Sequence, residues 1–323
     1  MKGGGRRRVY TRAMPMALNG IHFLVTYRCT YACDHCFVWS SPGAEETMTL
    51  AQLRDAMDQA AASGQVTMVY FEGGEPTLAY PVVLEAAAHA RTKGLEWGLV
   101  SNCFWATSVE DALVWLRPFK ELGVSDLSLS SYAYFVEDAD ETRLHNAAVA
   151  AQELDLPMLV LEVGAPACLD VPGLCLGDVG EVMYKGRAAV ELAPARADRP
   201  PDTLVTCPFE DFAEPGRAHL GADGELQICQ GISAGNVWRD GLVTILERYD
   251  PAALPVVREI LSGGPWALAQ AYGHTPERGL YADECHLCYE VRGALRERFP
   301  EVLAPAQCYG SAEAPGDDAE HGM

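Results

Sequence analysis

The sequence lacks any long apolar run and is poor in positive charge. No window in its 323 residues offers the roughly 18 uncharged apolar residues of a membrane-spanning helix. The basic start, residues 1–15, has no apolar stretch behind it, which excludes a secretory signal. Lys and Arg total 24 against 45 Asp and Glu, a net charge of -21. A surface this acidic repels phosphate backbones, so we expect no nucleic acid partner. With neither a membrane span nor a secretory signal, we expect a cytoplasmic protein without a membrane partner.

Cysteine is plentiful by contrast, with 11 residues, in a chain that shows no sign of secretion. Disulfides are rare where thiols stay reduced, so metal binding or catalysis explains these cysteines better. A first set, Cys29, Cys33 and Cys36, has C-x-x-x-C-x-x-C spacing and no fourth cysteine nearby. Three thiolates leave one coordination position of a tetrahedral site open.

Apolar runs and amphipathic segments alternate from residue 21 onward. Strands are predicted at 21–27, 66–71, 97–101, 125–130 and 157–163, and helices at 48–63, 81–93, 108–122 and 137–154. Thr49 and Gln52 resemble a capping box at the start of the first helix. Repeated β-α units of this length predict an α/β protein with a parallel sheet, open or closed into a barrel.

The alternation ends at about residue 185. Residues 186–235 are rich in Gly and Pro, and HLGADGELQICQ predicts a hairpin that turns at Asp223-Gly224. We therefore expect a flexible basic arm over 1–20, a core over 21–185, a smaller unit over 186–308 and a disordered acidic tail over 309–323.

Polar or metal-binding segments follow four of the predicted strands. The cysteine loop follows the first strand, and Gly73-Gly74-Glu75-Pro76 follows the second. Ser101-Asn102 ends the third strand and Ser130-Ser131 ends the fourth. In parallel sheets and barrels, ligands bind at the carboxyl ends of the strands. These segments should therefore meet at one rim.

The C-x-x-x-C-x-x-C loop and the GGEP turn, in this order, resemble the radical S-adenosylmethionine superfamily over about residues 20–165. The resemblance implies a partial (β/α)6 barrel and a [4Fe–4S] cluster whose unique iron binds S-adenosylmethionine. It also implies reductive cleavage of that cofactor to a 5′-deoxyadenosyl radical, with electrons from an external reductant such as flavodoxin or ferredoxin.

The same resemblance assigns roles to residues at the rim. Cys29, Cys33 and Cys36 would hold the cluster, and His35 would lie near the adenine. Gly73, Gly74, Glu75 and Pro76 would meet the methionine amino group, through the Glu75 side chain or a backbone carbonyl. Asn102, Ser130 and Ser131 match positions that contact the ribose or the carboxylate. The alternative for the cysteines is a zinc knuckle with His35 or a distant cysteine as fourth ligand.

A second cysteine set consists of Cys207, Cys229, Cys285 and Cys288. Four thiolates would saturate a second cluster, and DGELQICQGISAGN with the upstream GRA resembles the SPASM or shorter twitch extension. The resemblance implies an auxiliary [4Fe–4S] cluster that transfers electrons and favours a net oxidation. Structural zinc is the alternative, and Cys308 could exchange in as a ligand.

Lone thiols offer a further candidate. Cys103 at the rim, or Cys168 beyond the fifth strand, could return a hydrogen atom to a substrate radical, although buried thiols are more often plain core residues. The sequence does not rank the candidate bases Asp126, Glu162 and Asp178.

These observations predict a radical enzyme of the oxidoreductase or maturase type. It would abstract a hydrogen atom from a peptide or a small natural-product precursor, for an oxidation, a crosslink or an epimerisation. About 20 residues precede the first strand, fewer than a peptide-recognition domain needs. This weakens the expectation of a peptide substrate without excluding it, because such a domain can be a separate protein. The rival is a noncatalytic iron–sulfur or zinc scaffold, which would not cleave S-adenosylmethionine.

Overall fold

The computed structural model describes residues 16–131, 141–163, 176–180 and 182–310. Several predicted features lie outside these residues: the basic arm up to residue 15, the acidic tail from 311, the start of the helix expected at 137, and Cys168. Within the described residues, no helix is both long and apolar enough to cross a membrane.

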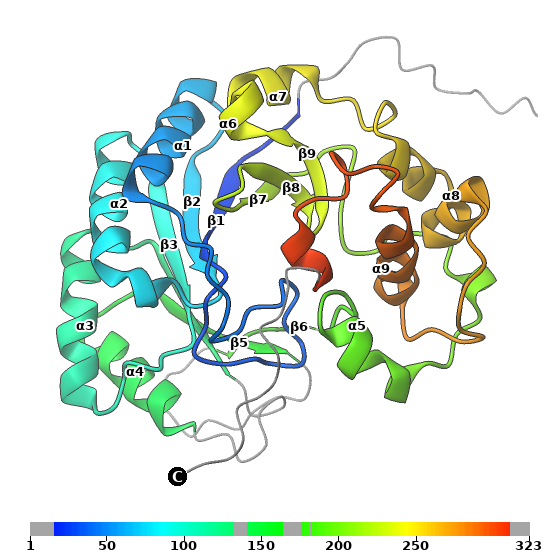
Figure 1. The fold of residues 1–323 in the computed structure, drawn as a ribbon. Coiled ribbons are helices and arrows are strands. Elements are labelled where there is room, and N and C mark those ends of the chain that lie inside the picture. The colour runs from blue at the N-terminus through cyan, green and yellow to red at the C-terminus, as the bar shows by residue number, and fades with distance from the viewer. Residues whose placement is uncertain (1–15, 132–140, 164–175, 181, 311–323) are drawn as a thin grey trace, which may run out of the picture.

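Six parallel strands form the core of one sheet. They are β1 (Gly20–Thr26), β2 (Met68–Gly73), β3 (Glu96–Ser101), β4 (Asp126–Ser130), β5 (Met158–Val163) and β6 (Leu176–Gly180), paired in chain order. Helices α1 (Leu50–Ser63), α2 (Tyr80–Thr92), α3 (Val109–Glu121) and α4 (Thr142–Glu153) cover one face of this sheet (Figure 1). The predicted α/β class and partial (β/α)6 barrel are confirmed.

Alternation along the strands separates two faces. Ile21, Phe23 and Val25 of β1 are fully buried in the main apolar core with residues of the covering helices. The intervening residues belong to the inner face, because successive side chains of a strand point to opposite sides. Helix α1 begins with the predicted capping box, in which Thr49 and Gln52 bond each other's backbone N–H groups.

The C-terminal part extends the same sheet. Strand β7 (Arg217–Leu220) pairs parallel with β1, and β8 (Glu225–Cys229) and β9 (Ile232–Asn236) continue antiparallel. The hairpin at Asp223-Gly224 is confirmed. Its Gly224 has φ +84°, and a Cβ there would lie 2.2 Å from the Trp238 ring, so the turn requires glycine.

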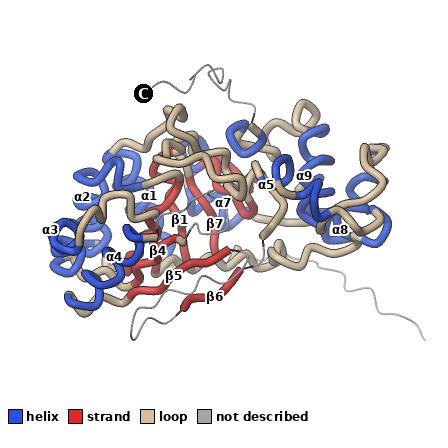
Figure 2. The backbone as a smooth tube through the Cα atoms, turned by 90° about the horizontal axis from the view of Figure 1, so that it is seen from below, coloured by secondary structure: helices blue, strands red, loops and turns tan. Residues whose placement is uncertain are grey.

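Five helices complete this part: α5 (Ala188–Glu191), α6 (Val237–Asp240), α7 (Leu242–Arg248), α8 (Pro255–Tyr272) and α9 (Glu284–Leu295). Figure 2 shows α5, α8 and α9 at the end of the molecule away from α1–α4. The sheet thus runs across the boundary predicted near 185, while the domain limits themselves stay predictions.

Candidate active site

The first cysteine set lies in the loop after β1. The backbone folds tightly there, with Cys36 N–H donating to Cys33 O at 3.0 Å and Cys29 N–H donating to Ser41 O at 3.0 Å. Burial, and to a lesser degree the neighbouring thiols of the set, raise the pKa of Cys29 to about 11 and of Cys33 to about 12. A cation bound among these thiols would supply the positive charge that their thiolate forms need.

The turn after β2 packs directly on this cysteine loop. Gly74 N–H donates to Thr26 O at 2.7 Å, and Glu75 N–H donates to Arg28 O at 2.9 Å. A Cβ on Gly73 would lie 2.4 Å from Thr26 O, and one on Gly74 would lie 2.2 Å from Arg28 O. Only glycine permits this approach, which explains the Gly-Gly pair as the contact between two rim loops.

The Glu75 carboxylate is fully buried and is used within the protein. It accepts from Thr77 N–H at 3.1 Å, from Ser101 Oγ at 3.0 Å and from Asn102 N–H at 2.7 Å. Burial raises the pKa of Glu75, and these donors oppose the rise. Of the two acceptors expected for the methionine amino group, the arrangement favours a backbone carbonyl of the glycine turn over the Glu75 side chain.

Asn102 connects the end of β3 to the cysteine loop. Its Nδ2 donates to Thr30 Oγ1 at 3.0 Å and lies 3.5 Å from Cys29 Sγ. An amide donor next to a sulfur favours the thiolate form over the thiol. The predicted rim residue therefore lies beside a predicted cluster ligand.

The other predicted cofactor contacts differ in environment. Ser130 ends β4 and is partly exposed, whereas the Ser131 hydroxyl donates to Glu141 Oε1 at 3.0 Å. Burial and the nearby Arg187 charge lower the pKa of His35 to about 4, so its ring is neutral near pH 7. Pro76 is buried and starts the short helical turn Pro76–Ala79.

Gly186 and Arg187 also contact the cysteine loop, a role that the sequence did not predict. The Arg187 guanidinium donates to Cys33 O at 2.6 Å and Ser40 O at 2.8 Å, and lies over the Trp39 ring at 5.3 Å. Gly186 touches the chain at Cys36, where a Cβ would lie 2.5 Å from the carbonyl oxygen. The GRA motif can be seen in the sequence, but nothing local indicates that its Arg187 contacts Cys33, which lies 154 residues earlier.

The structure also brings the second cysteine set together. Cys207, Cys229, Cys285 and Cys288 line one pocket with two buried cations, Lys185 and Arg292. Lys185 Nζ lies 3.9 Å from Cys229 Sγ, and Arg292 Nε donates to Cys288 O at 3.3 Å. Burial raises the pKa of Cys288 to about 12. Four converging sulfurs beside two cations form a donor set that fits a metal or a cluster of negative total charge.

Two further cysteines lie within the described residues, Cys308 and Cys103. Cys308 is buried and donates to Gln227 Oε1 at 3.2 Å. Cys103 is fully buried in the main core with φ 60°, and its Sγ is 3.7 Å from Ser101 O. The Cys103 thiol has no exposed surface in this structure. Its role as a hydrogen donor stays a prediction.

Polar side chains line the inner face of the barrel. They include His22, Tyr70, Glu72, Asp126, Ser128 and His219. The candidate base Glu162 lies instead on the helix-covered side of β5 with Val160. Asp126, one of the candidate bases, accepts from Tyr70 Oη at 3.3 Å and from Ser128 Oγ at 2.8 Å. The interior of a (β/α)8 barrel is usually filled by branched apolar residues, so a polar interior indicates a binding site. The side chain of Asp178 lies outside the described residues.

Comparison with known families agrees with the site. Residues 23–146, which include the cysteine loop, the GGEP turn and Asn102, match the model of the radical SAM superfamily. This part of the chain is therefore similar to the radical SAM superfamily. The superfamily implies a [4Fe–4S] cluster and S-adenosylmethionine as cofactors, and the residues of the rim fit both.

Individual proteins resemble parts of the chain. YydG of Bacillus subtilis (strain 168), which is named as a peptide biosynthesis protein, is 26% identical over 119 residues. That match covers 37% of this chain and 37% of YydG. Among solved structures, BtrN in complex with AdoMet and 2-DOIA has a TM-score of 0.48 and 14% identity, over 73% of this chain and 85% of BtrN. The anSMEcpe structure with bound AdoMet has a TM-score of 0.46 and 12% identity, over 88% of this chain and 97% of its own.

Proposed function

We propose that this protein is a radical enzyme that reductively cleaves S-adenosylmethionine and abstracts a hydrogen atom from its substrate. The observation that carries the proposal is the rim itself. Three thiols, a glycine turn that tolerates no side chain and the Asn102 amide lie together at the carboxyl ends of β1, β2 and β3. A metal scaffold would not need the open rim or the polar interior below it.

The residues of the rim divide the work. Cys29, Cys33 and Cys36 would hold a [4Fe–4S] cluster, which supplies the electron that splits the sulfonium of the bound cofactor. The glycine turn would accept from the methionine amino group, and the neutral His35 ring would pack near the adenine. Arg187 fixes the cysteine loop by two hydrogen bonds to its backbone.

The second cysteine set would hold an auxiliary [4Fe–4S] cluster of the twitch type. Its four thiols leave no open position, so it suits electron transfer rather than substrate binding. Lys185 and Arg292 would balance the negative charge of a thiolate cluster in a buried site. A cluster that accepts electrons within the protein favours net oxidation of the substrate. Structural zinc is the alternative for this cysteine set, and metal analysis distinguishes the two.

The substrate class proposed is a peptide, or else a small natural-product precursor. The similarity to YydG over 119 residues supports a peptide, and the polar interior suits a hydrogen-bonding substrate. Crosslinking, oxidation and epimerisation all begin with the same hydrogen abstraction. We place the reaction in the cytoplasm, where a flavodoxin or ferredoxin can supply electrons and a separate recognition protein can deliver a peptide.

Formation of 5′-deoxyadenosine tests the proposal. Protein reconstituted anaerobically with iron and sulfide should release 5′-deoxyadenosine when S-adenosylmethionine and dithionite are added. Cys33→Ala should abolish the release, and Cys175→Ala, a cysteine in neither set, should not. If the wild type holds zinc without iron, or if Cys33→Ala releases as much 5′-deoxyadenosine as the wild type, the proposal is wrong. A noncatalytic metal scaffold would then be the better interpretation.

A further inference from the structure

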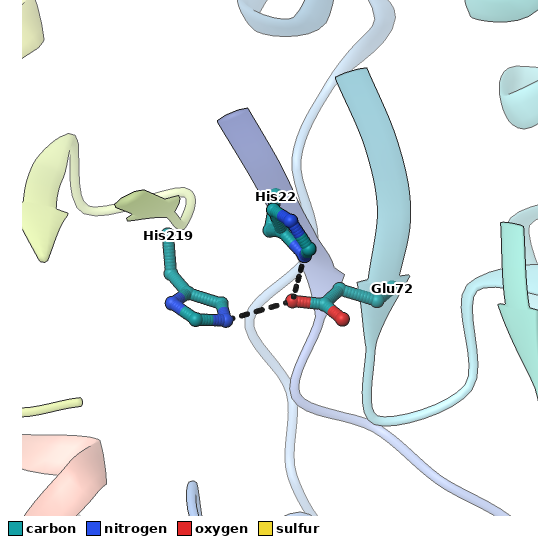
Figure 3. Close-up of side chains that lie close together, drawn as sticks. All are labelled: His22, Glu72 and His219. Atoms are coloured by element: carbon teal, nitrogen blue, oxygen red, sulfur yellow. Dashed lines mark ion pairs between the residues drawn. The ribbon is translucent and has the colours of Figure 1, made fainter. Parts of the chain in front are cut away.

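Three side chains from neighbouring strands converge in the barrel interior (Figure 3). They are His22 on β1, Glu72 on β2 and His219 on β7. His22 Nδ1 lies 3.2 Å from Glu72 Oε1, and His219 Nε2 lies 3.0 Å from the same oxygen. We propose that these residues bind one divalent first-row transition metal ion, at a site separate from both cysteine sets.

The spacing of the three donor atoms fits a metal. One ligand atom from each residue lies within 4.8 Å of the other two. Metal–nitrogen and metal–oxygen bonds of about 2.0–2.2 Å place neighbouring ligands roughly 2.8–3.6 Å apart, between octahedral and tetrahedral angles. The two separations, 3.2 Å and 3.0 Å, fall inside that interval. Two histidines and one carboxylate are also the protein ligands of known catalytic zinc and non-haem iron sites.

The contacts are short without being aligned hydrogen bonds. His22 Nδ1 and Glu72 Oε1 are both buried and neither makes a hydrogen bond within the described residues. The Gln230 amide nitrogen lies 3.5 Å from Nδ1 and 3.4 Å from Nε2 of His219. An atom nearly equidistant from both ring nitrogens is aligned with neither, because their lone pairs point away from each other. A metal ion bound by all three residues would explain why a nitrogen of His22 and a nitrogen of His219 both lie close to Glu72 Oε1.

The charges around Glu72 also favour a bound metal ion. Glu72 is a carboxylate in the barrel interior, and its only ion-pairing partners in the described part of the chain are these two histidines. No Lys or Arg among the described residues pairs with it. A buried carboxylate needs a positive partner, and a bound dication would supply one.

The location suggests what such a metal would do. Glu72 immediately precedes the Gly73 turn, and His219 lies 5.9 Å, between ring centroids, from Phe37, which follows Cys36. The site therefore lies next to the cysteine loop, on the polar inner face. Three protein ligands leave positions open, which would take an oxygen donor of the substrate such as a carboxylate, an amide carbonyl or a hydroxyl.

Cobalt binding tests the proposal without relying on turnover. Protein with its cysteine sets already loaded with iron and sulfide is titrated with Co²⁺, and the weak visible d–d bands of nitrogen and oxygen ligation are recorded. Wild type should bind one Co²⁺ per chain without the intense near-ultraviolet bands of cobalt thiolate. Glu72→Gln, which keeps the shape of the side chain, and His219→Ala should each weaken binding at least about 100-fold.

The chain offers a matched control in a second His–carboxylate pair. His89 Nε2 lies 2.6 Å from Asp58 Oδ1 between α1 and α2, away from the barrel interior. His89→Ala should leave Co²⁺ binding unchanged. Wild type that takes no Co²⁺, or Glu72→Gln and His219→Ala variants that keep native circular dichroism and bind Co²⁺ as tightly as wild type, would overturn the metal site. It stands or falls independently of S-adenosylmethionine cleavage.

Discussion

Adding a single methyl group at Gly186 should disturb the cysteine loop. Its φ is +62°, and an added Cβ would lie 2.5 Å from Cys36 O and 2.6 Å from the Phe37 carbonyl group. A left-handed conformation costs an L-residue about 1–2 kcal/mol. The backbone overlap adds about 1–3 kcal/mol, because the loop must move to accommodate the methyl group.

Gly94 separates these two contributions. It has φ +72°, but a Cβ there meets no atom within 4 Å. Gly94→Ala should therefore cost only the conformational part, about 1–2 kcal/mol. Gly186→Ala should cost about 2–5 kcal/mol in total and should also displace the carbonyls beside Cys36.

Two measurements on the anaerobically reconstituted variants check this reasoning. Denaturant unfolding should show a larger loss of stability for Gly186→Ala than for Gly94→Ala. Of these two variants, only Gly186→Ala should show an iron deficit, because Gly186 touches the cysteine loop and Gly94 does not. Equal stability and equal iron in the two variants would refute the claim that Gly186 and Arg187 shape the cysteine loop.

Three further outcomes follow from the described contacts. Glu75→Gln places an NH₂ group against either the Thr77 or the Asn102 N–H donor, since these bind different oxygens of Glu75, and should lower the free energy of unfolding by about 1–3 kcal/mol in urea melts. Lys185→Met should reduce iron from about eight to about four per chain, because it removes a cation beside the second cysteine set, and an unchanged count would contradict that role. Burial raises the pKa of Asp223 from 3.8 to about 6, so the folded protein holds this proton more tightly than the unfolded chain does. Wild-type stability should thus fall as pH rises from about 4 past 6, and Asp223→Asn should gain in melting temperature relative to wild type over that range; a constant difference would contradict it.

Much of the core could be predicted from the sequence because local patterns determine it. Apolar runs gave β1 to β5, Thr49 and Gln52 gave the start of α1, and Asp223-Gly224 gave the β7–β8 turn. Residues that follow strands were expected at one rim, and the contacts of Asn102 with the cysteine loop place it there.

The rest depends on contacts between distant segments. Nothing local indicates that β7 pairs with β1, and hence that His219 meets His22 and Glu72. For the same reason the role of Arg187 at the cysteine loop was not predicted. The role expected for the Glu75 side chain could not be judged from the motif, because its partners lie in the turn that follows it and at the end of β3.

The binding of S-adenosylmethionine to the open iron of the first cluster is the central claim. Low-temperature electron paramagnetic resonance of the dithionite-reduced protein tests it, in a Cys229→Ala variant that removes the second cluster. Adding the cofactor should change the spectrum, and cofactor labelled with ¹⁵N in its amino group should show a nitrogen coupling. A cluster whose spectrum is the same with and without S-adenosylmethionine would contradict the account.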